Sequence, residues 1–378
     1  MLNIIFLIII SPIIFYYFYF IVRIYIGLNK LEIWQSDKVL EEYVSIIIPF
    51  RNESENVLQI LESIENQNYP VEKYEVIFVN DSSTDDSLNK LNNNIKSKNI
   101  RVISVPENFA KQAHKKRAIR FGIENSKGEI IVTTDADCIL KPNWLKTLLN
   151  GFDEKTALIS GPVEFIEGKG LFYKLQKLEF TSLIITGAGL IGINKPMICN
   201  GANLTYRKNA FYEVGGFDGQ LSLSSGDDEI LMQRIWKKRK YKIKFCASKE
   251  AMSLTKANKN IKEFYNQRKR WASKGLFYEL KSTILSIASI FLFYLSLVLL
   301  LGLSFFKLDF YLPLFAAVFT VKIFLEYLVM HKGCSILFNK NILKYFFIAE
   351  ILHIPYIIIS GISGIFGNFS WKDRTLSR

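Results

Sequence analysis

Two stretches of this chain are apolar enough to enter a lipid bilayer, and they flank a segment of ordinary composition. Ile, Leu, Phe and Tyr crowd Met1 to Ile26 and Ile284 to Ile365, whereas Val44 to Lys281 mixes apolar and charged residues. A run of about 20 apolar residues is long enough for a helix to cross the hydrocarbon core. The chain therefore predicts four parts: an N-terminal transmembrane anchor (1–26), a linker (27–42), a globular domain (43–280) and a C-terminal membrane region (281–378).

The N-terminal stretch predicts a retained anchor and not a signal peptide. Leu2 to Val22 carries no charge, no basic region precedes it, and no small-residue cleavage site follows it. Arg23, Lys30 and Lys38 come directly after it. By the positive-inside rule, the N-terminus lies outside and the following domain lies in the cytoplasm. We therefore expect an integral protein of the plasma or inner membrane with a cytoplasmic globular domain.

The C-terminal region contains ionisable residues within its apolar stretches. Lys322 and Glu326 lie four residues apart, so they share one helix face. They could form a functional intramembrane pair, or Lys322 could snorkel toward the cytoplasmic end, which is the favoured interpretation. Glu350, His353 and Pro355 interrupt the last stretch, which either crosses the membrane or forms a re-entrant or interfacial segment broken at Pro355. The expected spans are 284–306, 311–330 and 342–366.

The charge of the chain is concentrated near the membrane segments. The net charge is +13, and much of the excess lies in Lys237–Lys240 and around Arg268–Arg270. Basic clusters beside membrane segments favour anionic lipid headgroups or polyphosphates. No nucleic-acid-binding motif accompanies them, so no nucleic-acid partner is expected. Four cysteines without a CxxC pair and three dispersed histidines predict neither a disulfide framework nor a zinc site.

The globular segment alternates strand-like and helix-like patterns. Val44 to Pro49 is a continuous apolar, β-branched run, as expected for a strand buried on both faces of a parallel sheet. The rhythm that follows predicts a doubly wound, mostly parallel α/β sheet. The further strands are expected at 75–79, 100–105, 129–134 and 157–165. The helices are expected at 54–66, at 111–125, and from a cap at Ser83 or Thr84 to Lys98.

Polar residues follow three of the predicted strands. They are Pro49 to Glu53, Asn80-Asp81, and Asp135-Ala136-Asp137. Ligands of such sheets bind beyond the carboxyl ends of the strands. Alternation along an extended chain points Asp135 and Asp137 the same way, and hard oxygen ligands there suit Mg²⁺ or Mn²⁺ holding a diphosphate. The alternative is a pair of solvated turn carboxylates. No glycine-rich phosphate loop is present, so carboxylates, metal and loop amides would hold a nucleotide.

The second half of the domain adds three segments of interest. Gly170 to Ile185 is an amphipathic helix that packs on the sheet or lies against the membrane. In Cys199 to Leu204, the Gly-Ala pair allows close approach by a ligand, so Gly201 and Asn203 are candidate substrate contacts. Gly226 to Glu229 opens a helix. Capping and the helix dipole explain one carboxylate there well, and three in a row less well.

Taken together, these segments resemble the family 2 glycosyltransferases, which are inverting, metal-dependent enzymes with the A-type nucleotide-sugar fold. The resemblance covers roughly Val44 to Gly275. The last motif is the QxxRW signature of the membrane-embedded branch that includes cellulose, chitin and hyaluronan synthases. The five motifs, in the order of the family, are Ser45–Glu53, Val79–Asp85, Asp135-Ala136-Asp137, Gly226–Glu229 and Gln267–Trp271.

The resemblance implies a role for each matching residue of the donor site. Asp81 would bind the nucleobase, because a carboxylate accepts the uracil N3–H, and Pro49 and Glu53 would pack around the base and ribose. Asp137 would be a metal ligand, with Asp135 close to the metal or the ribose. The metal would neutralise the departing diphosphate.

It also implies the groups that act on the acceptor. Asp228 would be the general base that takes the proton of the acceptor hydroxyl, so the anomeric configuration inverts. Gln267, Arg270 and Trp271 would contact the diphosphate and the acceptor. The chain departs from the family pattern at Asn80 and Asp227, and at His114-Lys115-Lys116, which leaves Lys115 without an assigned role.

The implied function is membrane-bound, inverting transfer of a sugar from a nucleotide-sugar donor, UDP-linked, to a hydroxyl of a lipid, lipid-linked glycan or polysaccharide. Two alternatives remain: a catalytically silent nucleotide- or partner-binding protein of the same fold, and a nucleotidyltransferase. The intact Asp81, Asp137, Asp228 and Arg270 argue against the first. The QxxRW segment beside a membrane span argues against the second.

Overall fold

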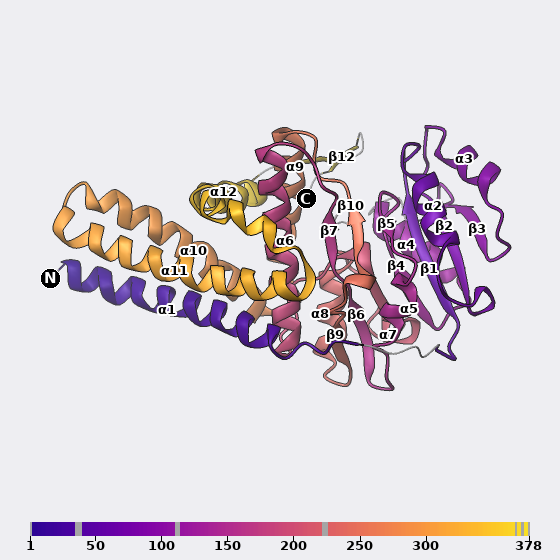
Figure 1. The fold of residues 1–378 in the computed structure, drawn as a ribbon, viewed down its shortest axis with the longest axis horizontal. Coiled ribbons are helices and arrows are strands. Elements are labelled where there is room, and N and C mark those ends of the chain that lie inside the picture. Colours follow the sequence, from indigo (N-terminus) through magenta and orange to yellow (C-terminus); the bar gives the residue numbers. More distant parts are fainter. Residues whose placement is uncertain are drawn as a thin grey trace.

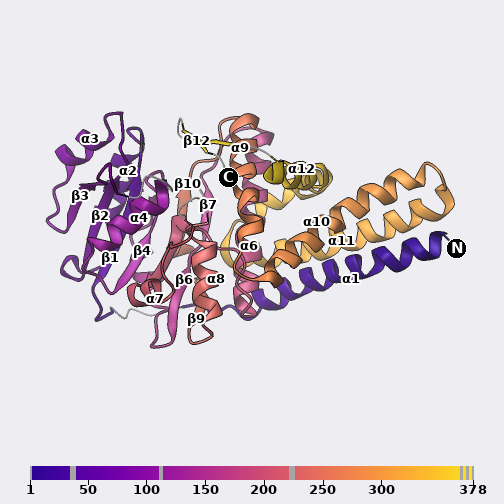
Figure 2. The same cartoon turned by 180° about the vertical axis from the view of Figure 1, so that it is seen from behind.

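The computed structural model describes residues 2–34, 40–109, 114–220, 226–366, 369–371 and 374–376. Lys38 and the first residues of the helix expected at 111–125 lie outside them. Three long helices project from an α/β domain, and further helices lie where the two parts meet (Figure 1; Figure 2).

The α/β domain is built on a seven-stranded sheet of order β3-β2-β1-β4-β8-β6-β9. Strands β1, β2, β3 and β4 are parallel, β6 and β9 are parallel to each other, and β8 runs antiparallel to its neighbours β4 and β6. This confirms the predicted α/β, mostly parallel sheet. Its strands are β1 (Val44–Phe50), β2 (Tyr74–Asn80), β3 (Ile100–Ser104), β4 (Ile130–Thr133), β6 (Thr156–Ser160), β8 (Leu204–Arg207) and β9 (Lys242–Phe245).

The single strand expected at 157–165 is wrong, because the chain changes sheet at Gly161-Pro162. A Cβ on Gly161 would lie 2.4 Å from the side chain of Asn203, so the chain passes too close for a side chain there. Pro162 has no N–H to donate to a strand ladder. The residues beyond it join a three-stranded sheet made of β5 (Ile139–Leu140), β7 (Val163–Phe165) and β10 (Ser253–Thr255).

The helix after β2 begins later than the sequence predicts. It starts at Ser87, with Asp86 in the capping position, and not at Ser83 or Thr84. The Ser83 N–H donates to Asn80 Oδ1 (2.9 Å) and the Thr84 N–H to Asn52 Oδ1 (2.8 Å), so these residues instead tie the loop after β2 to the loop after β1. The helices of the domain are α2 (Val57–Glu65), α3 (Ser87–Asn94), α4 (His114–Glu124), α5 (Trp144–Leu149), α7 (Lys208–Glu213) and α8 (Glu229–Lys237). Its 3₁₀ turns are η1 (Val71–Lys73), η2 (Gly201–Asn203) and η3 (Lys249–Ala251).

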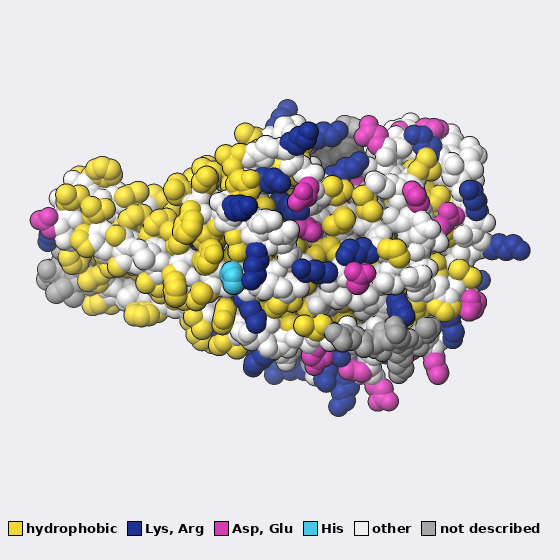
Figure 3. Space-filling model, viewed as in Figure 1, with side chains coloured by type: hydrophobic (Ala, Val, Ile, Leu, Met, Phe, Trp, Pro, Cys, Tyr) yellow, Lys and Arg dark blue, Asp and Glu magenta, His cyan; other side chains and the backbone are white. Residues whose placement is uncertain are grey.

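Four helices of the described residues are long and apolar enough to cross a membrane, judged by length and composition. They are α1 (Leu2–Leu28), α10 (Lys281–Ser304), α11 (Leu308–Leu337) and α12 (Phe346–Phe366), with η4 (Lys274–Phe277) before α10, η5 (Lys340–Tyr345) before α12, and a short hairpin of β11 (Phe369–Trp371) and β12 (Arg374–Leu376) after it. The projecting part of the surface is almost wholly apolar, and Lys and Arg side chains gather where it meets the domain (Figure 3).

Helix α12 is arranged differently from the other three. Helices α1, α10 and α11 run side by side away from the domain, whereas α12 is seen nearly end-on in both views and so runs across them (Figure 1; Figure 2). The helix continues through Pro355, so the alternative of a segment broken at that residue is wrong. By length and composition this segment is also one of the candidate membrane spans.

Two helices, α6 (Leu171–Gly192) and α9 (Ile261–Ser273), join the domain to the membrane helices. Phe180 of α6 stacks on Phe165 of β7, with ring centroids 4.3 Å apart. Further along α6, a Cβ on Gly27 would lie 1.8 Å from the carbonyl oxygen of Gly189, so glycines let α6 cross α1 at backbone contact. Helix α6 therefore packs on a sheet, as the first interpretation expects, and it also crosses the apolar helix α1. Contact of α6 with the membrane itself stays a prediction.

Candidate active site

All but one of the predicted site residues line one cavity of about 800 Å³. It begins at the carboxyl ends of β1, β2 and β4, where the sequence places Pro49, Asp81 and Asp137, and reaches the membrane helices. The tertiary fold thus brings together segments that are far apart in the chain. The predicted residues on its wall are Pro49, Glu53, Asp81, Asp135, Asp137, Gly201, Asp228, Gln267, Arg270 and Trp271.

Asp81 is held by arginines at the end of β2. Its side chain is buried, and Arg117 of α4 lies 2.6 Å from its Oδ1. Arg51 donates to the Asp81 carbonyl oxygen at 2.9 Å. Because a buried carboxylate needs a charged or hydrogen-bonding partner, Arg117 compensates the burial of Asp81 and fixes its orientation at the cavity wall.

Glu53 begins the turn that leads into α2. Its backbone N–H donates to Ser87 Oγ (2.8 Å), and its carboxylate accepts a hydrogen bond from Asn56 (2.6 Å). Pro49, at the end of β1, lines the cavity beside it. The two residues therefore form a fixed rim next to Asp81.

Asp135 and Asp137 follow β4, and a lysine ammonium already lies among the acidic groups. Lys115 Nζ is 2.6 Å from Asp135 Oδ1 and 3.5 Å from Asp227 Oδ2. Burial alone would lower the pKa of Lys115, but these carboxylates outweigh burial and raise that pKa above its usual range. Asp137 accepts a hydrogen bond from Thr255 Oγ1 at 3.2 Å.

The donor set of Asp135 and Asp137 fits Mg²⁺ or Mn²⁺. Carboxylate oxygens are the ligands these ions prefer, and Lys115 acts as a stand-in cation between two of the carboxylates. Such ions are usually held by one or two carboxylates together with phosphate oxygens and water. The same set would therefore bind a metal most strongly when a diphosphate is present.

Asp228 is fixed at the start of α8. Its Oδ2 accepts from the Gly201 N–H at 3.0 Å, and its Oδ1 accepts from the Glu229 N–H at 2.7 Å. Lys274 lies 3.8 Å from Asp228 and 2.9 Å from Glu229. Both oxygens of Asp228 are therefore held in place while its side chain still faces the cavity.

Glu229, the residue after Asp228, is buried. Burial raises the pKa of Glu229, while Lys274 works in the opposite direction. Burial would lower the pKa of Lys274, but Glu229 and Asp228 raise it. Tyr278 also donates to Glu229. Lys274 and Tyr278 therefore supply the partners that keep Glu229 in the interior, next to the backbone that positions Asp228.

The residues expected from the last motif lie on α9, on the side that meets α6. Arg268 is buried and pairs with Glu179 of α6. Its guanidinium lies 4.3 Å from the ring centroid of Trp271, and its neighbour Gln267 accepts a hydrogen bond from Asn258 at 3.0 Å. These contacts fix α9, so that Arg270 and Trp271 line the cavity.

Asn203 is placed differently from the prediction. It is fully buried, accepts from the Trp144 indole N–H (3.0 Å), and donates to the carbonyl oxygens of Pro162 and Ala251. All of these partners belong to the core, so a ligand contact is the wrong interpretation for Asn203. Gly201 does approach a partner closely, but a Cβ there would lie 3.0 Å from Asp227 Oδ2, so the close partner is a carboxylate.

Sequence reasoning gave no role to Lys115, Arg117 or Lys274. Lys115 and Arg117 lie near the start of α4, and Lys274 follows the QxxRW segment by three residues. The sequence signal for such a role was a basic residue on an element that begins near the carboxyl edge of the sheet. It was weak, because lysine and arginine are usually solvated on helix surfaces.

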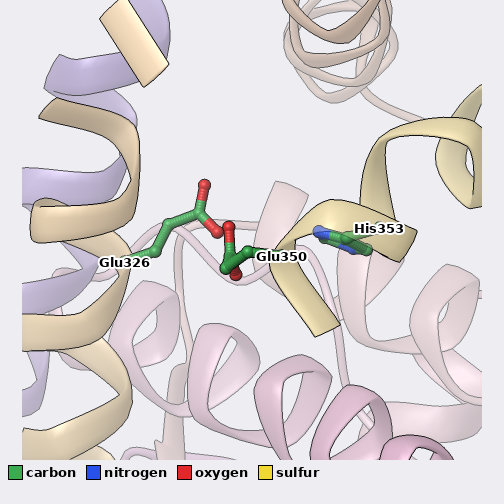
Figure 4. Close-up of side chains that lie close together, drawn as sticks. All are labelled: Glu326, Glu350 and His353. Carbon is green, nitrogen blue, oxygen red and sulfur yellow. The ribbon is translucent and has the colours of Figure 1, made fainter. Parts of the chain in front are cut away.

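A second group of ionisable residues lies between the long apolar helices. Donor atoms of Glu326, Glu350 and His353 lie within 4.8 Å of one another, and Glu326 and Glu350 point toward each other from α11 and α12 (Figure 4). Lys322 lies 3.0 Å from Glu326 and also pairs with Glu350, and its side chain is fully buried. The snorkelling interpretation of Lys322 is therefore wrong, and its ammonium already serves as the cation of this cluster.

Known proteins similar to this chain are glycosyltransferases. The family model described as Glycosyl transferase family 2 matches residues 45–215. Glycosyltransferase AglE of Haloferax volcanii is 29% identical over 188 residues, which are 49% of this chain and 59% of that protein. Poly-beta-1,6-N-acetyl-D-glucosamine synthase of Staphylococcus aureus is 25% identical over 267 residues, which are 68% and 60% of the two chains. The chain thus spans about three fifths of the length of these relatives.

A solved structure supports the fold. Mannosyltransferase PcManGT from Pyrobaculum calidifontis, in complex with GDP-Man and Mn²⁺, superposes with a TM-score of 0.57 at 16% identity, over 93% of this chain and 95% of that one. At this identity the likeness concerns the fold. It confirms the predicted A-type architecture.

Proposed function

We propose, from the premise that residues 45–215 form a glycosyltransferase family 2 domain, that the whole chain is a membrane-bound, inverting glycosyltransferase. It transfers a sugar from a nucleotide-sugar donor, UDP-linked, to a hydroxyl of a lipid, lipid-linked glycan or polysaccharide. One observation carries the proposal: Asp81, Asp137, Asp228 and Arg270, which come from four separate segments, line the same cavity.

In this proposal the donor lies across the carboxyl edge of the sheet. The Asp81 carboxylate, oriented by Arg117, accepts the nucleobase N3–H, and Pro49 and Glu53 pack around the base and ribose. Asp137 and Asp135 hold Mg²⁺ or Mn²⁺, which supplies positive charge to the departing diphosphate. Mn²⁺ bound by the similar fold of PcManGT supports this choice of ion.

Asp228 acts on the acceptor. It takes the proton of the acceptor hydroxyl as that oxygen attacks the anomeric carbon from the face opposite the diphosphate, and so the configuration inverts. The Gly201 and Glu229 amides hold its two oxygens, which fixes the direction of attack. Arg270 offers a fork of donors to the diphosphate, and Trp271 offers a surface for a sugar ring.

We further propose that the catalytic domain (43–280) lies in the cytoplasm, between the anchor and the C-terminal membrane region. The support is Arg23 near the end of α1, Lys30 just after that helix, and the basic side chains that gather where the domain meets the apolar helices (Figure 3). Nucleotide sugars would then reach the cavity from the cytoplasm, and the bilayer would surround α1, α10 and α11.

The test is incubation of membranes that contain the protein with a panel of radiolabelled nucleotide sugars. Transfer of label from one donor, with release of the nucleoside diphosphate, is expected. Binding of nucleotide without transfer would favour the silent protein, and release of sugar 1-phosphate, the leaving group when the nucleotidyl group is transferred, would favour a nucleotidyltransferase. Either result would overturn the proposed reaction.

A further inference from the structure

The cavity that holds the candidate active site continues between the membrane helices. Asp228 and Trp271 line its polar end, while Ile287 of α10 and Leu352 of α12 line its far end. At about 800 Å³, it lies in the size range of cavities that enclose a drug-sized ligand. A molecule that reaches Asp228 through this space can therefore keep another part of itself among the membrane helices.

Two groups of contacts hold α12 across the other helices. Near its start, Glu350 pairs with Lys322 of α11, and His353 Nδ1 lies 3.1 Å from the Tyr294 hydroxyl of α10. Further along, Tyr356 donates to Glu179 of α6 at 2.8 Å. Helix α12 is thus fixed as one wall of the cavity, opposite α10.

This wall reaches the lipid-facing surface. Leu352 is 49% exposed and Ile287 is 37% exposed, although both also line the cavity. Their neighbours Ile351 and Leu285 are exposed as well, at 66% and 68%, but do not line it. These two residues, one on α10 and one on α12, therefore belong both to the cavity wall and to the outer surface, and they mark a candidate opening of the cavity.

The side chains that line the cavity between the long helices distinguish two classes of occupant, a glycan chain and a hydrocarbon chain. Its wall is formed largely by apolar side chains, among them Ile21, Ile24, Ile290 and Phe291. Two carboxylates on this wall, Glu326 and Glu350, pair with the buried Lys322. A glycan chain would need hydrogen-bond partners along its whole length, and burying its hydroxyls without them is costly. A hydrocarbon chain needs none.

We infer that the acceptor is a membrane lipid with a hydroxyl on its head group, which enters sideways between α10 and α12 and keeps its apolar chain against them. This inference rests on the proposed function and narrows its acceptor to one class. The lipid oxygen forms the new bond to the anomeric carbon, and its proton passes to Asp228. The bond from that carbon to the diphosphate breaks, and the diphosphate leaves with the electron pair.

The experiment uses the full chain in membranes of the organism that naturally carries it, with the radiolabelled donor found active. After the reaction, label is divided between organic solvent and water. Leu352→Trp and Ile287→Trp place a larger side chain in the opening, and Ile351→Trp and Leu285→Trp are the matched controls on the outer surface. Slow hydrolysis of the donor in the absence of acceptor, measured as release of nucleoside diphosphate, reports separately on whether the donor site is intact.

The expected result is label in the organic phase. It should fall by about 10²-fold in the two opening variants, because a small displacement of a reacting group has an effect of that order. The controls should keep the wild-type value, and all four variants should keep donor cleavage by water. Preserved donor cleavage also shows that each variant is folded.

Two results would overturn the inference and leave the proposed function standing. One is label confined to water-soluble or polymeric glycan. The other is an equal effect of the opening and control variants on transfer. No transfer and no donor cleavage with any nucleotide sugar would overturn the proposed function, and the lipid acceptor with it.

Discussion

The ammonium of Lys115 lies 2.6 Å from Asp135 and 3.5 Å from Asp227, between acidic groups supplied by two distant segments. A positive charge is therefore present at this edge of the sheet before any ligand arrives. It offsets the repulsion between carboxylates that the fold brings together, and it competes with a metal ion for Asp135.

Lys115→Met should make the protein less stable without metal and more responsive to it. Without the ammonium, Asp135 and Asp227 repel each other, so the melting temperature should fall by about 2–4 °C for each kcal/mol lost. Mn²⁺ with a nucleoside diphosphate should restore more of the melting temperature than it adds to the wild type. Lys141→Met, which removes an exposed pair with Glu250, is the control. If Mn²⁺ raised the melting temperature of Lys115→Met by no more than that of the wild type, Lys115 would not be part of the metal-binding site.

Asp228→Asn should reduce turnover by about 10²–10⁴-fold, the usual contribution of a general base. Nucleotide binding, which depends on Asp81 and Asp137, should stay nearly unchanged. Asparagine also caps helices and keeps one of the two acceptor oxygens, so a residue that only caps α8 would lose some stability but little turnover in this variant. Asp86→Asn removes a carboxylate at the start of α3, outside the cavity, and is the control for the change of charge. Near-normal turnover of Asp228→Asn would move the base to Asp227 or Glu229.

Chelation by EDTA should abolish transfer, and Mg²⁺ or Mn²⁺ should restore it, because the diphosphate must be neutralised as it leaves. Asp137→Ala should remove the restoration and weaken calorimetric binding of Mn²⁺ in the presence of a nucleoside diphosphate. Full activity in EDTA would exclude the ion from the mechanism.

Lys116→Met should stabilise the protein at neutral pH. Lys116 is buried, and burial lowers its pKa to about 8, below the value of about 10.4 for an unfolded chain. The charged form is thus penalised in the folded state. The penalty is complete below pH 8, at most about 3 kcal/mol, and disappears as the pH rises toward 10.4.

The loss of the hydrogen bond from Lys116 to the Gln220 carbonyl oxygen offsets about 1 kcal/mol of this gain. The melting temperature of Lys116→Met should therefore exceed that of the wild type at pH 7, and the difference should shrink by pH 10. Lys98→Met, at an exposed position, should show no such difference. An equal rise in melting temperature at pH 7 and at pH 10 would contradict a penalty that comes from the charge of Lys116.

The orientation can be mapped with single cysteines, because Cys138, Cys199, Cys246 and Cys334 are all buried and should give little background. A cysteine at Lys98, in the domain, should react with an impermeant maleimide only after the cells are opened. A cysteine at Lys307, between α10 and α11 at the far end of the bundle, should react in intact cells. The reverse pattern would place the catalytic domain outside.

The sequence by itself determined the elements that depend on near neighbours. Continuous apolar runs gave the buried parallel strands, such as Val44–Phe50, and charge-free runs gave the long helices. It also placed Asp81 and Asp137 at strand ends and Asp228 at a helix start. These features follow from side-chain alternation and capping within a few residues, so a single segment contains the information.

Tertiary structure alone decided which distant residues meet. It buries Asn203 in the core, where Asn203 accepts a hydrogen bond from Trp144. It places Lys115 between Asp135 and Asp227. It also pairs the buried Lys322 with Glu350 of a helix that crosses α11. Each outcome depends on how sheets and helices pack, and on the need of a buried polar group for a partner from another segment. Local sequence patterns contain no record of such partners, because packing of the whole chain selects them.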